Sequence, residues 1–420
     1  MIELYDYQKQ AVQTAIPILL RYGVAYLALQ TRTGKTLISL TIAKHINLPV
    51  LFITKLKAIP SIEADHLKSE YHLDLQVTNY EQLKNIKKQH RLIIIDEAHS
   101  VGAYPKPSLR TKMLRKLTEG CPVLLLSATP TPESFSQIYH QIWASNAKLA
   151  FVYQYSNFYA WAKDYVKVKQ KYVATGQKVN DYSTAREDLI QPELDKIMLT
   201  TTQSDAGFIH TELNEIEVKC PFPEHLKRAY LDMKKDGVAR IMGFTIVAES
   251  AAARLSKLHQ FSGGTIIPDE CAEGIIISPH KINALDEILA KHIKIALYYK
   301  FNAERDLLLS VYGEQIFVDA ARFRDADSGI YISQFQSGRE GINLATAEAI
   351  VFYNIDHAYL SYEQTKNRIQ HKHRAVQGIL YYLVTDGGLE SSVMKMVRAK
   401  KNFTSSYFAR IENKLIKGWN

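Results

Sequence analysis

The stretch VAYLALQTRTGKTLISLTIAKHI, residues 24–46, decides the fold class of the first half of this 420-residue chain. Its apolar run at 24–29 is continuous rather than alternating, which is typical of a strand buried on both faces of a parallel sheet. The segment after the loop has the apolar period of a helix. Similar runs return at 50–54, 92–96 and 123–127, each followed by a helix-like segment. The first half is therefore predicted to be a doubly wound α/β domain.

The second half repeats this rhythm after an interruption. Strand-like runs resume at 215–220 and continue to 378–384, which predicts a second parallel-sheet lobe. We expect residues 1–210 and 211–420 to form the two lobes. The intervening segment at about 132–206 lacks the strand–helix rhythm, and we expect it to be a helical insertion.

Periodic spacing supports helix in that insertion. Aromatic and apolar residues recur every three or four positions, and lysines recur every four positions. The two series predict opposite faces of one helix. They are Phe158, Trp161, Tyr165, Val168 and Tyr172 on one face, and Lys163, Lys167 and Lys171 on the other.

Composition narrows the class of protein. With 46% hydrophobic and 23% charged residues, the chain has the profile of a folded protein rather than a disordered or fibrous one. The net charge of +9 is compatible with a polyanionic partner and equally with a role in solubility. Cys121, Cys220 and Cys271 are odd in number and far apart, so neither a disulfide framework nor a zinc site is predicted.

The N-terminal residues MIELYDYQKQ do not form the apolar run of a signal peptide, and no stretch approaches the length of a membrane span. We therefore expect a soluble protein of the cytoplasm, with no contact to a membrane.

The loop after the first predicted strand has the chemistry of a phosphate site. Gly34 lets backbone amides approach a phosphate, Lys35 supplies a positive charge to the β- and γ-phosphates, and Thr36 has a hydroxyl for Mg²⁺. Two positions depart from the usual glycine-rich pattern, because this chain has Leu29 and Arg32 where that pattern has glycine. A residue with a Cβ at position 32 is expected to take an ordinary φ unless the loop is strained. Alone, this loop is as compatible with a chance turn before a helix as with a nucleotide site.

Two further runs, LIIIDEAHS and LLLSATPTP, extend the pattern. Asp96 stands at the end of a predicted buried strand, where it would hold Mg²⁺ through water, and Glu97 would orient an attacking water. Ser127 and Thr129 end the next strand and are expected to bond to this acidic pair, where they would respond to the γ-phosphate. An acidic helix cap is the alternative interpretation of Asp96 and Glu97.

The ordered set GKT, DEAH and SAT resembles the first lobe of superfamily 2 helicases. NYEQL at 79–83, RLSKLHQFSGG at 254–264, SPHKINALDEIL at 278–289 and the long run at 332–374 look like the Swi/Snf-type translocases, in particular the compact forms of bacteriophages. The resemblance covers nearly the whole chain. It implies two RecA-like lobes that bind Mg²⁺ and ATP between them, with DNA across both.

The resemblance assigns roles to individual positions. Catalytic roles fall on Lys35, Asp96, Glu97 and Arg368, and metal binding on Thr36 and Asp96. Contacts with ATP fall on Gln8, which matches an adenine-reading glutamine, and on Arg32, Thr33, Gly34, Lys35, Thr36, Gly341, Arg368 and Arg374. Coupling falls on Ser127, Thr129 and Gln364, and phosphate-backbone contacts with DNA fall on Thr54, Lys55, Tyr80, Ser337, Arg339 and Asn343.

The motif does not decide which residue of the second lobe supplies a positive charge to ATP. Arg368 keeps the spacing of four from Gln364, which predicts one face of a helix. The family has another arginine where this chain has His371, and Arg374 follows three positions later. Arg368 is our first choice, with Arg374 and Arg32 as alternatives.

These residues predict a DNA-stimulated, Mg²⁺-dependent ATPase that moves along DNA and acts as a monomer. We expect it to serve phage replication or recombination, with phage replication proteins as partners. An RNA helicase and a nucleotide-gated DNA-binding module with little turnover are the alternatives. The lysine series at 163–171 has two interpretations, a solvated helix face or an extension of the DNA path. The aromatic series is either core packing or a platform for base stacking.

Overall fold

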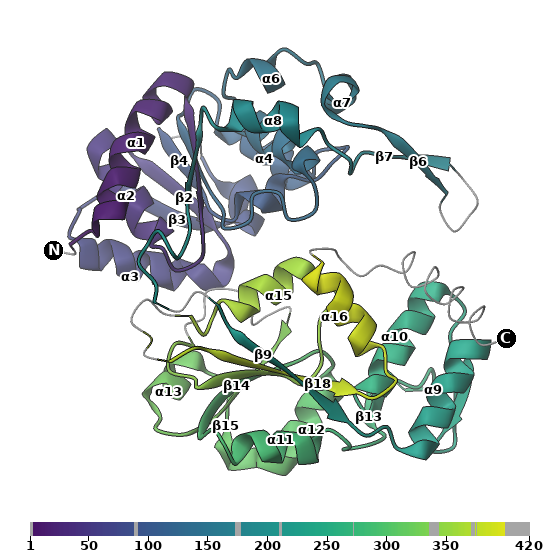
Figure 1. The fold of residues 1–420 in the computed structure, drawn as a ribbon. Coiled ribbons are helices and arrows are strands. Elements are labelled where there is room, and N and C mark those ends of the chain that lie inside the picture. The colour runs from purple at the N-terminus through teal and green to yellow at the C-terminus, as the bar shows by residue number, and fades with distance from the viewer. Residues whose placement is uncertain are drawn as a thin grey trace. The chain divides into compact units, whose positions relative to one another are not determined.

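The computed structural model of the protein describes residues 3–87, 91–172, 178–209, 212–271, 273–335, 344–370, 374 and 376–399. The chain divides into two compact units, Met1–Phe208 and Ile209–Asn420 (Figure 1). Each unit is built on a six-stranded sheet in which every strand pairing is parallel. The predicted α/β class with two parallel-sheet lobes is confirmed.

The sheet of unit 1 has the strand order β3-β2-β4-β5-β1-β8. Its strands are β1 (Val24–Leu29), β2 (Val50–Thr54), β3 (Leu75–Asn79), β4 (Leu92–Ile95), β5 (Val123–Leu126) and β8 (Met198–Thr201). Its helices are α1 (Asp6–Tyr22), α2 (Lys35–Ile46), α3 (Ile59–Ser69), α4 (Leu109–Leu117), α5 (Ile138–Ala144), α6 (Ala150–Tyr153), α7 (Phe158–Tyr165) and α8 (Glu187–Leu194). Short 3₁₀ helices are η1 (Leu56–Ala58), η2 (Tyr80–Asn85), η3 (Ala98–Val101) and η4 (Phe135–Gln137).

Both faces of this sheet are buried, as the continuous apolar runs predict. Alternate strand residues enter two separate cores because side chains along a strand point to opposite faces. Leu27 and Phe52 pack with α1, α2 and α3, whereas Tyr26 and Ile53 pack with the helices from α4 to α8. The sheet is therefore covered on its two sides by early and late helices of the unit.

The segment at 132–206 is only partly helical, so the prediction of a helix through the whole series at 158–172 is wrong. Helix α7 ends at Tyr165, and Val166 is extended with φ −133° and ψ 132°. The chain continues as β6 (Lys169–Tyr172), which pairs antiparallel with β7 (Lys178–Asp181). Val166 and Val168 favour extended backbone, and the hydrogen bonds of the hairpin satisfy groups that a longer helix would have used.

The aromatic residues of α7 are core residues. Phe158 and Trp161 are buried, and both pack against Tyr139 of α5, with ring centroids 5.5 Å and 5.2 Å from it. Packing accounts for these residues, and base stacking by them is not supported. Lys167 and Lys171 lie beyond the helix, so they do not share a helical face with Lys163.

The sheet of unit 2 has the strand order β15-β16-β14-β17-β18-β9. Its strands are β9 (Asn214–Cys220), β14 (Lys294–Tyr299), β15 (Ile316–Phe317), β16 (Gly329–Gln334), β17 (Ala349–Phe352) and β18 (Ile379–Thr385). Two small hairpins are β10 (Val238–Ile241) with β11 (Phe244–Val247), and β12 (Thr265–Ile266) with β13 (Ile275–Ile276). The helices are α9 (Glu224–Asp236), α10 (Ala251–Ser262), α11 (Ile282–Leu289), α12 (Asn302–Tyr312), η5 (Gly313–Gln315), α13 (Ala320–Asp325), α15 (Tyr359–Lys366) and α16 (Glu390–Arg398).

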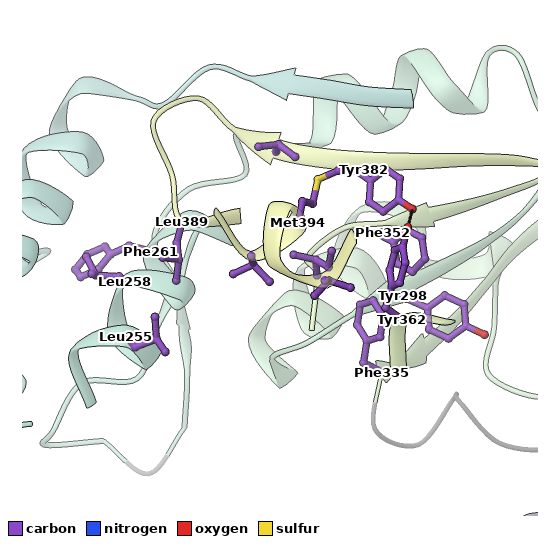
Figure 2. Close-up of a cluster of buried hydrophobic side chains, with 14 of the residues drawn as sticks. Leu255, Leu258, Phe261, Tyr298, Phe335, Phe352, Tyr362, Tyr382, Leu389 and Met394 are labelled. Atoms are coloured by element: carbon purple, nitrogen blue, oxygen red, sulfur yellow. Dashed lines mark hydrogen bonds between the residues drawn. The ribbon is translucent and has the colours of Figure 1, made fainter. Parts of the chain in front are cut away.

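Aromatic side chains fill one face of the unit 2 sheet, as Figure 2 shows. The Phe352 ring stacks on Tyr382 with centroids 4.9 Å apart and on Phe335 with centroids 5.4 Å apart. The Tyr382 hydroxyl donates to the Tyr362 hydroxyl at 3.1 Å, and Tyr362 donates in turn to Glu215. Each such ring contributes about 2–3 kcal/mol through its burial. The second core, on the opposite face, packs α11 and α12 against the sheet.

Among the described residues, no helix combines the length and apolar character needed to cross a bilayer. Cys121, Cys220 and Cys271 are free thiols, as predicted.

Candidate nucleotide site

The loop between β1 and α2 turns the chain so that α2 begins at Lys35. Gly34 precedes it with φ +84°, in the left-handed region that a residue with a Cβ rarely adopts. The side-chain amide of Gln8 covers this glycine, and a Cβ at position 34 would lie only 2.2 Å from Gln8 Nε2. The φ favours glycine here, and any larger residue would also displace the end of the Gln8 side chain.

Gln8 fixes the loop to the start of α1. Its Nε2 donates to the carbonyl of Thr33 at 3.2 Å, and the Tyr7 hydroxyl donates to the same carbonyl at 3.0 Å. Its Oε1 accepts from the backbone N–H of Tyr5 at 3.0 Å. The buried Gln8 thus links the phosphate loop to the start of α1. Its contact with adenine stays a prediction.

Of the two alternatives for Arg32, an ordinary φ or a strained loop, the structure shows the strained one. Its φ is +65°, so a residue with a long side chain occupies a left-handed position in the loop. Such a conformation costs about 1–2 kcal/mol in a residue with a Cβ. The loop keeps its turn at this cost, and strain of this kind is commonly found at functional sites.

The Lys35 ammonium lies inside the loop, where its Nζ donates to the carbonyls of Leu29 at 2.9 Å and Gln30 at 3.2 Å. It also lies near enough to Asp96 to lower the pKa of that carboxyl. The structure therefore brings the predicted phosphate-binding lysine and the predicted metal-binding aspartate together. Because β1 and β4 are parallel strands of one sheet, both residues follow carboxyl ends at the same sheet edge.

Three neighbours hold Asp96 in place. The Thr54 hydroxyl donates to its Oδ2 at 2.8 Å, the backbone N–H of Glu97 donates to its Oδ1 at 3.0 Å, and the Tyr80 hydroxyl donates to its backbone carbonyl. Burial and the nearby Glu97 carboxylate raise the pKa of Asp96 to about 6, although the Thr54 hydrogen bond and Lys35 oppose this shift. A cation bound here would reduce the repulsion between the two carboxylates and favour the ionised form of Asp96.

Thr54 and Tyr80 are buried side chains bonded to Asp96, and their contact with DNA stays a prediction. Thr54 is fully buried at the end of β2, and Tyr80 is 4% exposed. Neither side chain presents a donor to a phosphate at the surface. Both hydroxyls donate to Asp96, and the prediction that the neighbouring Lys55 contacts DNA is likewise untested.

Ser127 reaches the acidic pair through a histidine that the sequence argument missed. His99 Nδ1 lies 2.9 Å from the Ser127 hydroxyl and 3.4 Å from Glu97 Oε2. The Ser127 hydroxyl also accepts from the backbone N–H of Thr129 at 3.1 Å. The expected direct bond from Ser127 to the acidic pair is thus replaced by a chain that runs from Glu97 through His99 to Ser127 and Thr129. His99 is the last residue of the DEAH motif, so the sequence already contained this feature.

Thr36 and Asp96 offer the donors that suit Mg²⁺. A hydroxyl and a carboxylate are hard oxygen ligands, and Mg²⁺ is usually held by one or two such groups together with waters and substrate phosphates. Within the described residues, no group of three or more His, Cys, Asp or Glu side chains forms a cage for a metal on its own. This donor set fits an ion bound jointly with a nucleotide.

The predicted residues of unit 2 are placed less completely. Gly341, Asn343, Ser337 and Arg339 lie outside the described residues, as does His371. Helix α15 carries the buried Gln364 but ends at Lys366. Arg368 follows in a turn in which its backbone N–H donates to Thr365, so the prediction that Gln364 and Arg368 share one helical face is wrong.

The Arg374 side chain bonds to backbone carbonyls of unit 2, and its contact with the nucleotide stays a prediction. Its Nη1 donates to the carbonyls of Ala347 at 3.1 Å, Ile369 at 3.3 Å and Ala345 at 3.4 Å, and its Nη2 donates to that of Glu348 at 3.0 Å. The guanidinium therefore fastens the segment before β17 to the segment after α15. Burial lowers the pKa of this arginine.

Comparison with known proteins gives few matches that bear on this site. No family model matches the chain, and no curated protein matches it. Among solved structures, the Sulfolobus solfataricus SWI2/SNF2 ATPase core in complex with dsDNA is similar, with 16% identity, a TM-score of 0.44 and coverage of 98% of this chain and 95% of that one. A likeness at this level carries none of the functional argument, which rests on the side chains described above.

Proposed function

We propose that the protein is an ATPase of the superfamily 2, Swi/Snf-like type that couples hydrolysis of Mg²⁺-bound ATP to movement along DNA. One observation carries the proposal. Lys35, Asp96 and Ser127 follow the adjacent parallel strands β1, β4 and β5 at one sheet edge, where the Lys35 charge lowers the pKa of Asp96 and Ser127 contacts His99, which lies 3.4 Å from Glu97. The carboxyl edge of a parallel sheet is where α/β proteins commonly bind nucleotides.

Each residue of this edge has a part in binding ATP. The amides at the start of α2 and the Lys35 ammonium would hold the β- and γ-phosphates, with phosphate oxygens replacing the carbonyls of Leu29 and Gln30 around Nζ. Thr36 and Asp96 would hold Mg²⁺, which neutralises charge on the phosphates. Gln8, besides supporting the loop, is proposed to contact adenine.

Glu97 is proposed to orient water and accept its proton as the water oxygen attacks the γ-phosphorus. The bond from that phosphorus to the bridging oxygen breaks, and its electron pair leaves with ADP. His99 contacts both Glu97 and Ser127, so a change at the γ-phosphate would alter the hydrogen bonds of Ser127 and Thr129. The chain of contacts would thereby report hydrolysis to the rest of unit 1.

Unit 2 supplies the remaining proposed contacts. Arg368 is proposed as the cation that stabilises the transferring charge, with Gln364 and Gly341 as coupling residues. Lys55 of unit 1, with Ser337, Arg339 and Asn343 of unit 2, would contact the DNA backbone without reading sequence. A compact, phage-encoded translocase that acts as a cytoplasmic monomer in replication or recombination is the setting that we propose.

The test is the rate of ATP hydrolysis without nucleic acid and with duplex DNA, single-stranded DNA or RNA. We expect Mg²⁺-dependent hydrolysis that DNA stimulates. Greater stimulation by RNA would make the protein an RNA helicase. Nucleotide-dependent DNA binding with negligible turnover under all four conditions would make it a nucleotide-gated DNA-binding module.

A further inference from the structure

The hairpin of β6 and β7 forms an arm that belongs to neither core of unit 1 (Figure 1). Its two strands pair only with each other, as a separate two-stranded sheet. Side chains on both faces are exposed, including Lys169 and Gln170 of β6 and Val179 and Asn180 of β7. A two-stranded ribbon without an apolar face gains little stability by itself. Its conformation therefore depends on how its base is held.

The base of this arm is fixed to unit 1 by hydrogen bonds and by packing. The Ser134 hydroxyl donates to the carbonyl of Ser183 at 2.8 Å, and the Ser136 hydroxyl donates to that of Tyr182 at 2.6 Å. The Tyr182 ring packs edge-on against the buried Phe158, with centroids 5.4 Å apart. The protein thus anchors a ribbon whose described residues beyond the base face solvent.

The arm carries an uneven charge. Between positions 167 and 180 the sequence has four lysines and no acidic residue. Lys169 and Lys171 alternate along β6, so they lie on one face of the ribbon; Lys167 precedes this strand, and all three lysines are exposed. Lys171 forms an ion pair with Asp181, which reduces its share of the charge. We call these three residues the lysine face.

We propose that the lysine face binds the phosphate backbone of the nucleic acid on which the protein moves. Alternate residues of a strand are about 6.8 Å apart, and successive phosphates rise by about 3.4 Å along one DNA strand. Because the phosphates also turn about the duplex axis, their separation along the backbone is larger than this rise and is on the scale of the spacing of the ammonium groups. The ribbon also has the dimensions of elements that enter the major groove of a duplex.

Charge and composition favour nucleic acid over a lipid surface. Binding of a protein segment to anionic lipid usually combines basic residues with large apolar side chains that enter the bilayer interface. On the lysine face the cross-strand neighbours within the ribbon are Val179 and Asp181, so it offers no such anchor. Lysine as the only basic residue type of this face also favours contact without base readout. The inference rests on the proposed function and extends it by naming a contact surface.

The test compares two triple variants with the same change in net charge. In the arm variant Lys167, Lys169 and Lys171 are replaced by Gln. In the control variant three exposed lysines elsewhere on unit 1, Lys112, Lys116 and Lys148, are replaced by Gln. Affinity for a duplex of random sequence is measured by fluorescence anisotropy over a series of salt concentrations, and melting temperatures check the fold of each variant.

We expect the slope of log affinity against log salt to become shallower by about 2 in the arm variant, since each phosphate contact contributes about 0.9 and Lys171 is partly neutralised. Affinity near 0.1 M salt should fall about 10- to 100-fold. The control variant should change neither quantity by comparable amounts, and Lys→Arg at the three arm positions should retain binding.

The outcomes separate this inference from the proposed function. If the wild-type protein binds no nucleic acid, the proposed function fails. If it binds and the arm variant matches the control variant, the inference about the arm is overturned while the proposed function stands. Loss of binding to phosphatidylcholine–phosphatidylserine vesicles in the arm variant, with DNA affinity intact, would overturn it in favour of a lipid surface.

Discussion

Units 1 and 2 have the same architecture but place different chemistry at the carboxyl ends of their strands. In unit 1, Asp96 and Glu97 stand next to each other, and the pKa of Asp96 is raised because its carboxyl is buried beside a second negative charge. In unit 2, Asn354 follows β17 and pairs with His259 at 2.5 Å and with the buried Glu304 at 2.6 Å. In unit 1, a bound cation would reduce the repulsion between the two neighbouring carboxylates. In unit 2, the polar side chains form hydrogen bonds with one another.

The comparison teaches that a parallel sheet fixes where functional groups can gather but not which groups do so. A buried ion pair in unit 2 makes the same point. Lys281 donates to Glu390 at 2.8 Å and to the carbonyls of Tyr353 and Leu383, which joins α11 to β17, β18 and α16. This lysine is fully buried and serves the framework, whereas Lys35 of unit 1 is placed for a ligand.

The largest expected effect falls on unit 1. Glu97→Gln should lower ATP turnover about 10³-fold, because the amide keeps the shape but cannot accept a proton. Nucleotide affinity should be retained in this variant, whereas Lys35→Ala should lose both affinity and turnover. Turnover at saturating ATP and binding of a fluorescent nucleotide measure the two effects.

Two exposed residues of unit 1 provide controls, Glu119→Gln and Lys44→Ala. Lys44 is on the same helix as Lys35, so it tests any general effect of removing charge from α2. Turnover of Glu97→Gln at the wild-type rate would contradict the assignment of the water-activating residue.

The second prediction asks whether unit 2 takes part in the chemistry. Arg368→Ala should reduce DNA-stimulated turnover about 10³-fold, as expected when a cation at the transferring phosphate is lost. Arg322→Ala, an exposed arginine on α13, is the matched control and should turn over normally. If Arg368→Ala hydrolyses ATP normally while Arg32→Gly does not, the cation comes from unit 1.

The third prediction asks which arginine of unit 2 stabilises the fold and which takes part in ATP hydrolysis. Arg374→Ala removes the donors to four backbone carbonyls and should lower the free energy of unfolding by about 3 kcal/mol. Turnover per folded molecule should change far less than in Arg368→Ala. Urea unfolding beside activity normalised to folded protein measures both, and a loss of turnover without a loss of stability would return Arg374 to the nucleotide site.

The fourth prediction uses histidines whose pKa is lowered by loss of solvation, which among the described residues are more numerous in unit 2. Burial lowers the pKa of His280 to about 3 and that of His357 to about 4, and in unit 1 it lowers that of His140 to about 4. His280 bonds to Thr385 and lies near Lys281, and His357 contacts His259 and lies near Lys300 and Asp356.

A lowered folded-state pKa gives stability that is present above the unfolded pKa of about 6.5 and is lost as pH falls toward the folded value. Between pH 7 and 5.5 each of these histidines should cost about 1 kcal/mol, and burial also lowers the pKa of His259 in unit 2, so unit 2 should lose more stability than unit 1. Hydrogen exchange by peptide, corrected for intrinsic rates, measures the two units separately. Equal losses would contradict the contrast.

The smallest expected effect concerns strain. Arg32→Gly should remove about 1–2 kcal/mol of strain from the left-handed backbone of the folded state. It should also raise the entropy of the unfolded chain, which costs about 0.5–1 kcal/mol. The free energy of unfolding should therefore rise by less than about 1 kcal/mol. Thermal unfolding measures this, with Arg21→Gly at the end of α1 as a control that should destabilise. A stability loss in Arg32→Gly would show that its side chain, not its backbone, maintains the loop.

The sequence by itself determined the sheet framework and the first half of the site. Buried parallel strands appear as continuous apolar runs, and GKT and DEA directly follow two of them, so β1, β4, Lys35, Asp96 and Glu97 were all identified from local pattern. These features are encoded by neighbouring residues, and the hydrophobic effect selects them without reference to distant parts of the chain.

Only the tertiary structure decided what depends on residues far apart in the sequence. Thr54 lies 42 positions from Asp96, and His99 lies 28 positions from Ser127, yet each pair is hydrogen-bonded. The same holds for Arg374, whose carbonyl partners include that of Ala347, 27 positions away. No local pattern contains these distances, because burial and hydrogen-bond partners are set by how strands and loops pack rather than by spacing along the chain.

The lysine series shows both contributions in one segment. Its residue types came from the sequence, but a spacing of four and a spacing of two are both present among Lys163, Lys167, Lys169 and Lys171. The end of α7 at Tyr165 and the pairing of β6 with β7 select the spacing of two. Long-range hydrogen bonds between strands therefore decided that Lys169 and Lys171 share a face.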